Sequence, residues 1–329
     1  MSDSRRYFIP GGAGFIGSHF TDRLLSDGAA AVTIYDNFSS GREWHFEHHR
    51  GDPRFRVIRA DAQDLDALTH AMRGHDVVIH LASNPNIARA ATEPEIDFYE
   101  GTLLTNNVLE AMRRCGANLI LYASGSGVYG DLGDTEIDED HGPLVPISTY
   151  GASKLAGEAL ISAYCHMFGF TGRIFRFGNV VGPRQTHGVG FDFIRQLLGR
   201  ADADAPPRRL RILGDGTQSK SYVHVRDIVD AVLIAAAHSK QRYAVYNVAT
   251  DYITVTEIAR LAVECCGLDP GEVRFEYTGG SRGWKGDVPV VRLNASRIRR
   301  LGWVPSRKSR EALRDSMMAM LADVRAGRL

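Results

Sequence analysis

A glycine-rich turn near the N-terminus sets the strongest limit on how this chain can fold. Residues 7–10 form an apolar run that stops at the turn Gly11-Gly12-Ala13-Gly14-Phe15-Ile16-Gly17. Residues 18–26 then show helical spacing, so a strand is expected to turn directly into a helix. Glycines at this spacing let backbone amides approach a pyrophosphate at the positive end of the helix. The turn therefore predicts a dinucleotide site, with contacts from Gly11, Gly14, Phe15, Ile16 and Gly17.

Asp36 indicates which dinucleotide is bound. It ends the strand-like run at residues 32–35, about twenty residues after the glycines. A carboxylate there can accept hydrogen bonds from both ribose hydroxyls and would repel a 2′-phosphate, so NAD is favoured over NADP. Arg42 is a weaker signal for NADP, and capping of the following turn is the alternative role of Asp36. We predict NAD as the cofactor, with further contacts from Asn37, Ser39 and Ser40.

Short apolar runs continue to alternate with helical segments. Residues 56–59, 77–80 and 119–122 are the next strand candidates. This alternation predicts an α/β fold, a doubly wound Rossmann parallel sheet whose carboxyl-edge loops line the ligand crevice. The loops after the first two of these runs then supply cofactor contacts from Asp61, Ala62, Leu81, Ala82 and Ser83.

The second half of the chain is expected to form a smaller, interleaved C-terminal substrate-binding domain. Helical spacing at residues 226–238 and 254–266, around a strand at 246–248, indicates a return to the cofactor domain. The low-complexity stretch 201–207 is predicted to be an exposed loop. The predicted division is residues 1–178 plus 223–262 for the NAD-binding domain and 179–222 plus 263–329 for the substrate domain.

Tyr150 and Lys154 are the candidate catalytic pair. Their spacing of four places both side chains on one face of a helix. A neighbouring cation lowers the pKa of a phenol from its usual value of about 10, which would allow Tyr150 to take a proton from a sugar hydroxyl. Ser124 and Ser126 follow the strand at 119–122 and could relay that proton. The alternatives are a half-exposed Tyr/Lys pair and serines that serve turn geometry.

Charge and hydropathy limit the partners. Lysine plus arginine and aspartate plus glutamate both number 39, so there is no electrostatic case for nucleic acid or an anionic membrane as a partner. No apolar run reaches membrane-spanning length, and the N-terminus is too short and polar for a signal peptide. A cytoplasmic protein is expected.

Three histidines, His45, His48 and His49, cluster around Trp44 and raise the question of a metal. This segment has no carboxylate or cysteine companion in a ligand pattern and falls in a polar loop. We therefore expect solvent-exposed histidines and no metal site.

The glycine turn, Asp36, the serine-bearing loop and the Tyr150/Lys154 pair, in this order, resemble an extended short-chain dehydrogenase/reductase acting on nucleotide sugars. The resemblance covers nearly the whole chain and is closest to UDP-hexose or UDP-glucuronate 4-epimerases. It implies that the Tyr150 phenolate deprotonates the sugar C4 hydroxyl while C4 passes hydride to tightly held NAD. The resulting 4-ketose turns in the pocket and takes the hydride back on its other face.

The resemblance also implies a set of substrate contacts. Ser126 and Tyr150 would face the sugar, and Asn179 the diphosphate. Lys220 stands where the family usually has a phosphate-binding arginine, so a point charge replaces a bidentate fork. Further contacts are a diphosphate ligand at Arg282, with Lys285 as a second candidate, and a ribose ligand at Asp287. Arg184 or Lys285 could bind a sugar carboxylate or a phosphate.

Gly125 is the main departure from the family pattern, because it occupies the place of the catalytic serine or threonine. Either Ser124 or Ser126 supplies the hydroxyl, or Tyr150 works without one. Nucleotide-sugar 4,6-dehydratases carry an Asp-Glu pair just after that position, where this chain has Ser126 and Gly127. A dehydratase or a UDP-glucuronate decarboxylase is therefore the alternative, and a non-catalytic NAD-binding regulator a more distant one.

The predicted helix 151–168 carries more apolar surface than one sheet face needs. With residues 103–112 it could form an intersubunit four-helix bundle, as in the family, so a homodimer is expected. Burial within the monomer is the competing interpretation.

Overall fold

A seven-stranded parallel sheet forms the centre of the computed structural model, which describes residues 4–199 and 208–329. Its strands lie in the order β11-β7-β5-β4-β1-β2-β3, and every neighbouring pair is parallel. The direction of winding reverses between β1 and β4, so the predicted doubly wound α/β sheet is confirmed. The strands are β1 (Arg6–Pro10), β2 (Ala31–Asp36), β3 (Phe55–Arg59), β4 (Val77–His80), β5 (Leu119–Gly125), β7 (Thr171–Phe177) and β11 (Tyr243–Val248).

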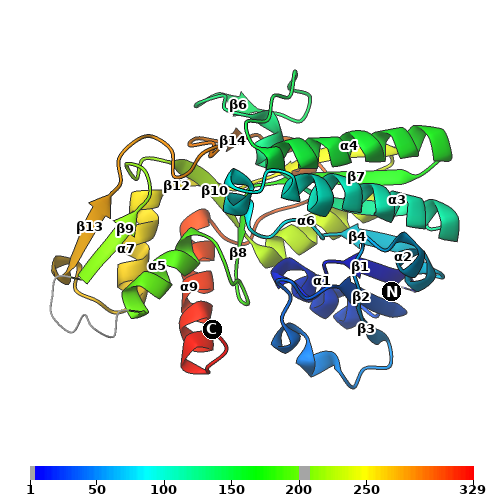
Figure 1. Ribbon diagram of the computed structural model, residues 1–329, viewed down its shortest axis with the longest axis horizontal. Coiled ribbons are helices and arrows are strands. Elements are labelled where there is room, and N and C mark those ends of the chain that lie inside the picture. The colour runs from blue at the N-terminus through cyan, green and yellow to red at the C-terminus, as the bar shows by residue number, and fades with distance from the viewer. Residues whose placement is uncertain (1–3, 200–207) are drawn as a thin grey trace.

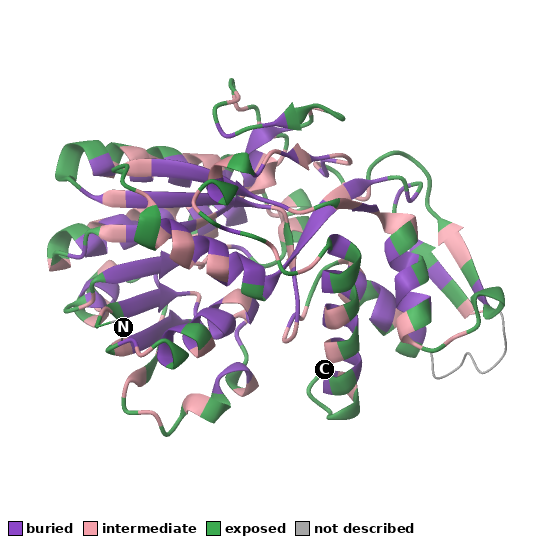
Figure 2. Cartoon of the chain, turned by 180° about the vertical axis from the view of Figure 1, so that it is seen from behind, coloured by how far each residue is buried: buried purple, intermediate pink, exposed green. Residues whose placement is uncertain are grey.

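Helices cover both faces of this sheet (Figure 1). Tyr7 and Ile9 of β1 point into one apolar core and Phe8 into the other, because successive side chains of a strand face opposite ways. The strands in the middle of the sheet are buried between the two helix layers (Figure 2). Helices α1 (Phe15–Ser26) and α6 (Val225–His238) pack on the first core, and α2 (Leu65–Met72), α3 (Leu104–Cys115) and α4 (Thr149–Phe168) on the second.

A second, smaller unit packs around its own apolar core. Its three-stranded sheet has the order β12-β10-β8, and a two-stranded sheet pairs β13 with β9. Its strands are β8 (Asn179–Val181), β9 (Arg208–Ile212), β10 (Ser219–His224), β12 (Tyr252–Thr254) and β13 (Val273–Tyr277), and its helices are α5 (Val189–Leu198), α7 (Val255–Cys265) and α9 (Ser309–Arg325).

Short elements complete the chain. They are strands β6 (Glu136–Ile137) and β14 (Arg292–Leu293), helix α8 (Ser296–Arg299), and the turns η1 (Glu43–His45), η2 (Glu47–His49), η3 (Ile87–Ala91), η5 (Ser126–Tyr129) and η6 (Pro270–Glu272). The segment η4 (Phe98–Leu103) is a π-helix that leads into α3. Across the described residues, no helix combines the length and the apolar character that crossing a bilayer requires.

The chain passes from one unit to the other at different residues from those predicted. The predicted boundary at residue 262 falls inside α7, whose buried Ile258 and Leu261 pack in the core of the second unit. Conversely, Ile298 and Trp303 lie in the first core, although residues 263–329 were assigned to the substrate domain. Helical spacing identifies the apolar face of a helix but does not show which of the two units that face packs against. The predicted loop at 201–207 lies outside the described residues.

Candidate active site

A cavity of about 1270 Å³ runs along the carboxyl edge of the central sheet and into the second unit. At one end it is lined by the turn between β1 and α1 and by the loops after β2, β3, β4 and β5. At the other end it is lined by residues of β8, α5 and β10. Pockets for one small ligand usually measure roughly 300–1,000 Å³, so this cavity has room for a dinucleotide and a second ligand.

The glycine turn makes the dinucleotide end of the cavity. Gly11 has a φ of 78°, and a Cβ there would stand 2.6 Å from the backbone N of Ala82. Gly14 precedes α1 without a side-chain cap, so the free N–H groups of the first helical turn remain available to an anion. All five predicted contacts of this turn, from Gly11 to Gly17, line the cavity.

Asp36 is anchored beside the glycine turn. Its carboxylate accepts hydrogen bonds from the backbone N–H groups of Ala13 at 3.0 Å and Phe38 at 2.7 Å. Burial raises the pKa of Asp36, although both of these hydrogen bonds oppose the shift. Arg42 donates to the carbonyl of Gly41 and does not line the cavity, which fits NAD better than NADP. The other predicted cofactor contacts that line this end are Asn37, Ser39, Ser40, Asp61, Ala62, Leu81, Ala82 and Ser83.

Tyr150 and Lys154 lie on the first turns of α4. Ser148 caps this helix by accepting a hydrogen bond from the Gly151 N–H at 3.1 Å. Tyr150 lines the cavity, whereas Lys154 is buried behind it and donates from Nζ to the Ala123 carbonyl at 2.9 Å. The Lys154 ammonium is 5.4 Å from the centre of the Tyr150 ring. The pair therefore shares one helix face, and the lysine also contacts the end of β5.

Burial dominates the protonation of this pair. It raises the pKa of Tyr150 to about 12, against a hydrogen bond with Ser83, and the nearby Asp97 adds to the rise. Burial lowers the pKa of Lys154 to about 8, against the attraction of Asp97 and Glu158. The predicted ionisation of the phenol relies on the cationic ring of bound NAD as well as on Lys154, so it stays a prediction.

Asp97 is a site residue that sequence reasoning missed. It is buried and accepts hydrogen bonds from Asn84 Nδ2 at 2.8 Å and from Thr149 Oγ1 at 2.7 Å. It thus ties the loop after β4 to the start of the catalytic helix. The available signal was a charged residue between the large apolar residues Ile96 and Phe98, just before the π-helix; such helices occur frequently at functional sites.

The two candidate serines have different environments. Ser124 donates its hydroxyl to Glu158 Oε1 at 2.5 Å, and Glu158 also pairs with Arg176 at 2.7 Å. Both serines line the cavity, but the hydroxyl of Ser126 has no hydrogen-bond partner within the described part of the chain. A Cβ on Gly125 would meet no described atom within 4 Å, so this position leaves open space. Ser126 is therefore the hydroxyl that is free to face a ligand.

The substrate end contains only some of the predicted contacts. Asn179, Lys220 and Asp287 line the cavity, and the Lys220 ammonium is 2.5 Å from Asp287 Oδ1. Arg184 and Arg282 do not line it, so their predicted ligand contacts are not supported by their placement.

Long-range ion pairs explain the position of both arginines. Arg184 pairs with Asp22 of α1, and Arg282 pairs with Asp131 at 2.6 Å. Neither carboxylate is close to its arginine in the sequence, so no local pattern could reveal the pairing. Among the lining residues of the substrate end that were absent from the predicted set are Arg195, Gln196, Arg211 and Trp284.

Comparisons with known proteins agree with this geometry. The model of the NAD dependent epimerase/dehydratase family matches residues 7–249. The chain is 33% identical over 310 residues to the UDP-glucose 4-epimerase of Mycolicibacterium smegmatis, covering 91% of this chain and 93% of that protein. It is 31% identical over 312 residues to UDP-glucuronic acid decarboxylase 1 of Xenopus tropicalis, covering 92% and 69%. A crystal structure of UDP-galactose 4-epimerase superposes with a TM-score of 0.83 at 35% identity, covering 97% of this chain and 99% of that chain.

Proposed function

Because this chain belongs to the NAD dependent epimerase/dehydratase family, we propose that it is an NAD-dependent epimerase that inverts carbon 4 of a nucleotide sugar, either a UDP-hexose or UDP-glucuronate. One observation carries the proposal. The phenol of Tyr150 lies on the wall of a cavity that has a dinucleotide end beside Asp36 and a second end beside Lys220 and Asp287. Tyr150 can therefore contact a sugar that lies between the bound dinucleotide and the nucleotide to which the sugar is attached. Similarity to a UDP-glucose 4-epimerase and to a UDP-galactose 4-epimerase supports this choice of reaction.

The residues around Tyr150 suit a proton transfer that is reversed within one turnover. Bound NAD supplies a hydride acceptor, and its cationic ring favours the phenolate that Lys154 alone does not stabilise. Tyr150 then accepts the proton of the C4 hydroxyl as carbon 4 becomes a ketone, and returns it when carbon 4 is reduced on the opposite face. The free hydroxyl of Ser126 can bind the same oxygen, and the space beside Gly125 leaves room for the sugar to turn.

The second end of the cavity suits a nucleoside diphosphate. Lys220 offers a cation at the wall, and Asn179, which pairs with Tyr222 two residues further along β10, offers an amide. Arg195 and Arg211 add two further cations that line this end. We propose that these groups bind the diphosphate and that Asp287 binds the nucleotide ribose once the ligand loosens its ion pair with Lys220.

The decarboxylase relative makes a lyase the second candidate. A 4,6-dehydratase needs an acid and a base at C5 and C6 beside the oxidised sugar. The two residues after Gly125 carry no carboxyl group, and Asp97 has both oxygens occupied by Asn84 and Thr149. The proposal therefore stays with epimerisation.

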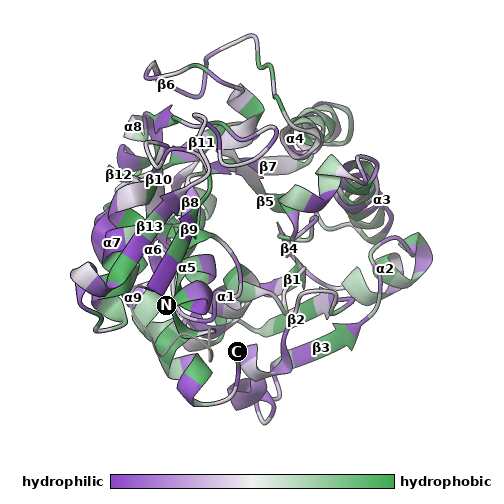
Figure 3. Cartoon of the chain, turned by 60° about the vertical axis from the view of Figure 1, so that its left-hand side comes forward, coloured by the Kyte–Doolittle hydropathy of each residue, from purple (hydrophilic) through white to green (hydrophobic). Residues whose placement is uncertain are grey.

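A homodimer is proposed through α3 and α4, which lie side by side on one face of the sheet (Figure 3). At the two ends of this helix pair, apolar side chains are exposed, with Phe98 at 54% and Met167 at 72%. Tyr99 and Phe168 are exposed beside them. Apolar side chains that remain exposed are typical of an interface. The expected cytoplasmic location and the expected absence of nucleic-acid and membrane partners stay predictions.

Incubation of the purified chain with a panel of UDP-sugars, without added NAD, tests the proposed reaction. Mass spectrometry and NMR should find an isomer of unchanged mass, and the Tyr150→Phe variant should lose roughly 10²–10⁴-fold in turnover. Loss of water would assign a dehydratase instead, and loss of carbon dioxide a decarboxylase. Unchanged turnover in the variant would refute the role of Tyr150.

A further inference from the structure

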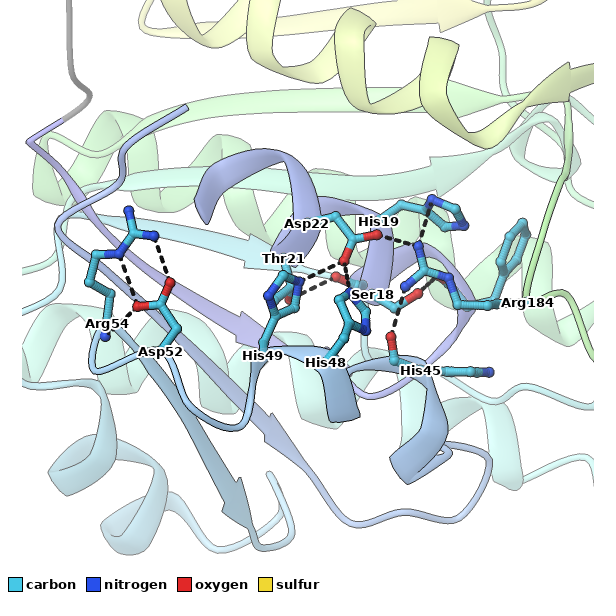
Figure 4. A network of polar contacts seen from close by, with 12 residues as sticks. Ser18, His19, Thr21, Asp22, His45, His48, His49, Asp52, Arg54 and Arg184 are labelled. Atoms are coloured by element: carbon cyan, nitrogen blue, oxygen red, sulfur yellow. Dashed lines mark hydrogen bonds and ion pairs between the residues drawn. The ribbon is translucent and has the colours of Figure 1, made fainter. Parts of the chain in front are cut away.

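A group of potential metal ligands lies outside the cavity, where the segment between β2 and β3 packs on α1 (Figure 4). The sequence showed His45, His48 and His49 in this segment without a carboxylate in a metal-ligand pattern with them. The structure supplies that companion, because Asp22 of α1 lies opposite the turn η2. His45 is not part of the group. Contrary to the expected exposure, it is buried, and its Nδ1 bonds the Ala13 carbonyl at 2.9 Å.

Three side chains meet at one oxygen atom. Asp22 Oδ1 is 2.9 Å from Nε2 of His48 and 2.7 Å from Nε2 of His49. The ligand atoms of all three residues lie within 4.8 Å of one another. The two rings are stacked in a tilted arrangement with their centres 4.0 Å apart, so both Nε2 atoms point the same way.

We propose that Asp22, His48 and His49 form a binding site for a divalent cation of the zinc class. Two imidazole nitrogens and one carboxylate oxygen are a common three-ligand set for zinc, with a water molecule as the fourth ligand. Zinc binds such atoms at about 2.0–2.2 Å, which places two tetrahedral ligands roughly 3.4 Å apart. The observed distances of 2.7 and 2.9 Å therefore have to widen by about 0.5–0.7 Å, a shift within reach of side chains at the protein surface.

The charge state of Asp22 suits a ligand. Arg184 pairs with the Asp22 carboxylate and favours its anionic form. Arg184 binds the other oxygen, Oδ2, so Oδ1 stays available on the side of the histidines. The guanidinium also repels a cation, which favours strong nitrogen ligation over a purely electrostatic ion such as Mg²⁺.

Solvent can reach the fourth position. The side chain of His48 is 51% exposed and that of Asp22 is 34% exposed, so an ion can enter and keep a water ligand. Each imidazole now donates a proton from Nε2 to the carboxylate. Binding requires that proton to move to Nδ1 or leave to solvent, so the affinity should fall at acid pH.

A bound ion would link the segment after β2 to helix α1. That segment follows the Asp36 turn, which contacts the proposed cofactor site. The site itself does not line the cavity, so its role would be to stabilise the fold and not to take part in the reaction.

The experiment uses the full chain without a histidine tag, treated with a chelator and returned to buffer. Zinc binding is measured by competition with a chromogenic chelator, and cobalt is added separately to record its visible spectrum. We expect one zinc per chain, and a cobalt spectrum of the tetrahedral type. His48→Ala and His49→Ala should each weaken zinc binding at least tenfold and abolish that spectrum.

His70→Ala is the matched control, because His70 is exposed on α2, away from this group. It should bind zinc like the unaltered chain. Melting temperatures without metal show whether the variants are folded, and zinc should raise the melting temperature of the unaltered chain and the control only. Absence of zinc binding in the unaltered chain, or equal binding in folded His48→Ala and His49→Ala variants, would overturn the proposal.

Discussion

Ser124 donates its hydroxyl to Glu158 at 2.5 Å, while the same carboxylate pairs with Arg176. Both partners of this ion pair are almost completely buried, at 4% and 3% exposure. The ring of Tyr129 lies against the Arg176 guanidinium, at 4.6 Å from its central carbon, and extends the network beneath the serine-bearing loop. These contacts hold the end of β5 and occupy the hydroxyl of Ser124, although Ser124 also lines the cavity.

The two serines should consequently respond differently to mutation. Ser126→Ala removes the hydroxyl that faces the cavity and should lower kcat by roughly 10–100-fold, the scale expected for one lost catalytic hydrogen bond. Ser124→Ala should lower the free energy of unfolding by about 1–2 kcal/mol, because Glu158 loses a buried hydrogen bond. Steady-state kinetics and urea unfolding of both variants measure these effects. A larger loss of kcat in Ser124→Ala would reverse the assignment.

Glu158→Gln should strongly lower the free energy of unfolding, although it is a conservative change. The amide leaves the Arg176 charge buried without its partner, and breaking such a pair costs about 3–5 kcal/mol. Urea unfolding measures this loss in the free energy of unfolding. Glu93→Gln is the control, because Glu93 pairs with Arg89 at the exposed surface, and it should leave the unfolding midpoint unchanged. Equal midpoints for the two variants would contradict the structural role of the buried pair.

His80 should make stability sensitive to acid. It is fully buried on β4, and burial, assisted by the charge of Lys154, lowers its pKa from 6.5 to about 3. Between these values the unfolded chain binds more protons than the folded chain, so stability falls as the pH drops below about 6.5. This group contributes a slope approaching 1.4 kcal/mol per pH unit.

His80→Gln keeps a polar group near Thr105, the partner of Nε2, but does not titrate. Urea unfolding between about pH 7 and pH 5 should therefore show a shallower loss of stability in this variant. His70→Gln, at an exposed position on α2, should keep the original slope. Identical slopes in all three proteins would show that His80 does not remain neutral in the folded chain.

Met167 offers a test of the proposed dimer. Its side chain is 72% exposed near the end of α4, beside Phe168. Met167→Lys places a charge on the apolar face, and burying it at an interface would be unfavourable, so the dimer should dissociate at least tenfold more readily. Met318→Lys is the matched control, because Met318 is also exposed, at 50%, but lies on α9 and not on the proposed interface. Sedimentation velocity distinguishes the two, and a monomeric unaltered chain would refute the interface.

Features set by local spacing could be predicted from the sequence. The glycines and Asp36 lie where their intervals indicated, because the turn between β1 and α1 and the end of β2 follow from short apolar runs. Tyr150 and Lys154 share a helix face because four residues complete about one helical turn.

Features set by contacts between distant segments could not be predicted. No local pattern in the sequence shows that Asp22 pairs with Arg184. The packing of α7 on the second core likewise depends on α5 and α9, which lie more than 40 residues away in the sequence. The protonation of Tyr150 also depends on distant segments. Burial, the largest influence on its pKa, comes from the whole fold and not from the local spacing to Lys154.

Lys220 is predicted to bind substrate without taking part in the chemistry. Its ammonium lines the second end of the cavity and is held by Asp287, and a charge-assisted contact to a diphosphate is worth about 1.5–3 kcal/mol. Lys220→Ala should therefore raise KM by roughly 10–100-fold and change kcat little, because the contact is equal in the ground and transition states. Lys285→Ala removes an exposed lysine that does not line the cavity, and it should leave both constants unchanged. A fall in kcat with unchanged KM for Lys220→Ala would instead place this lysine close to the reacting carbon.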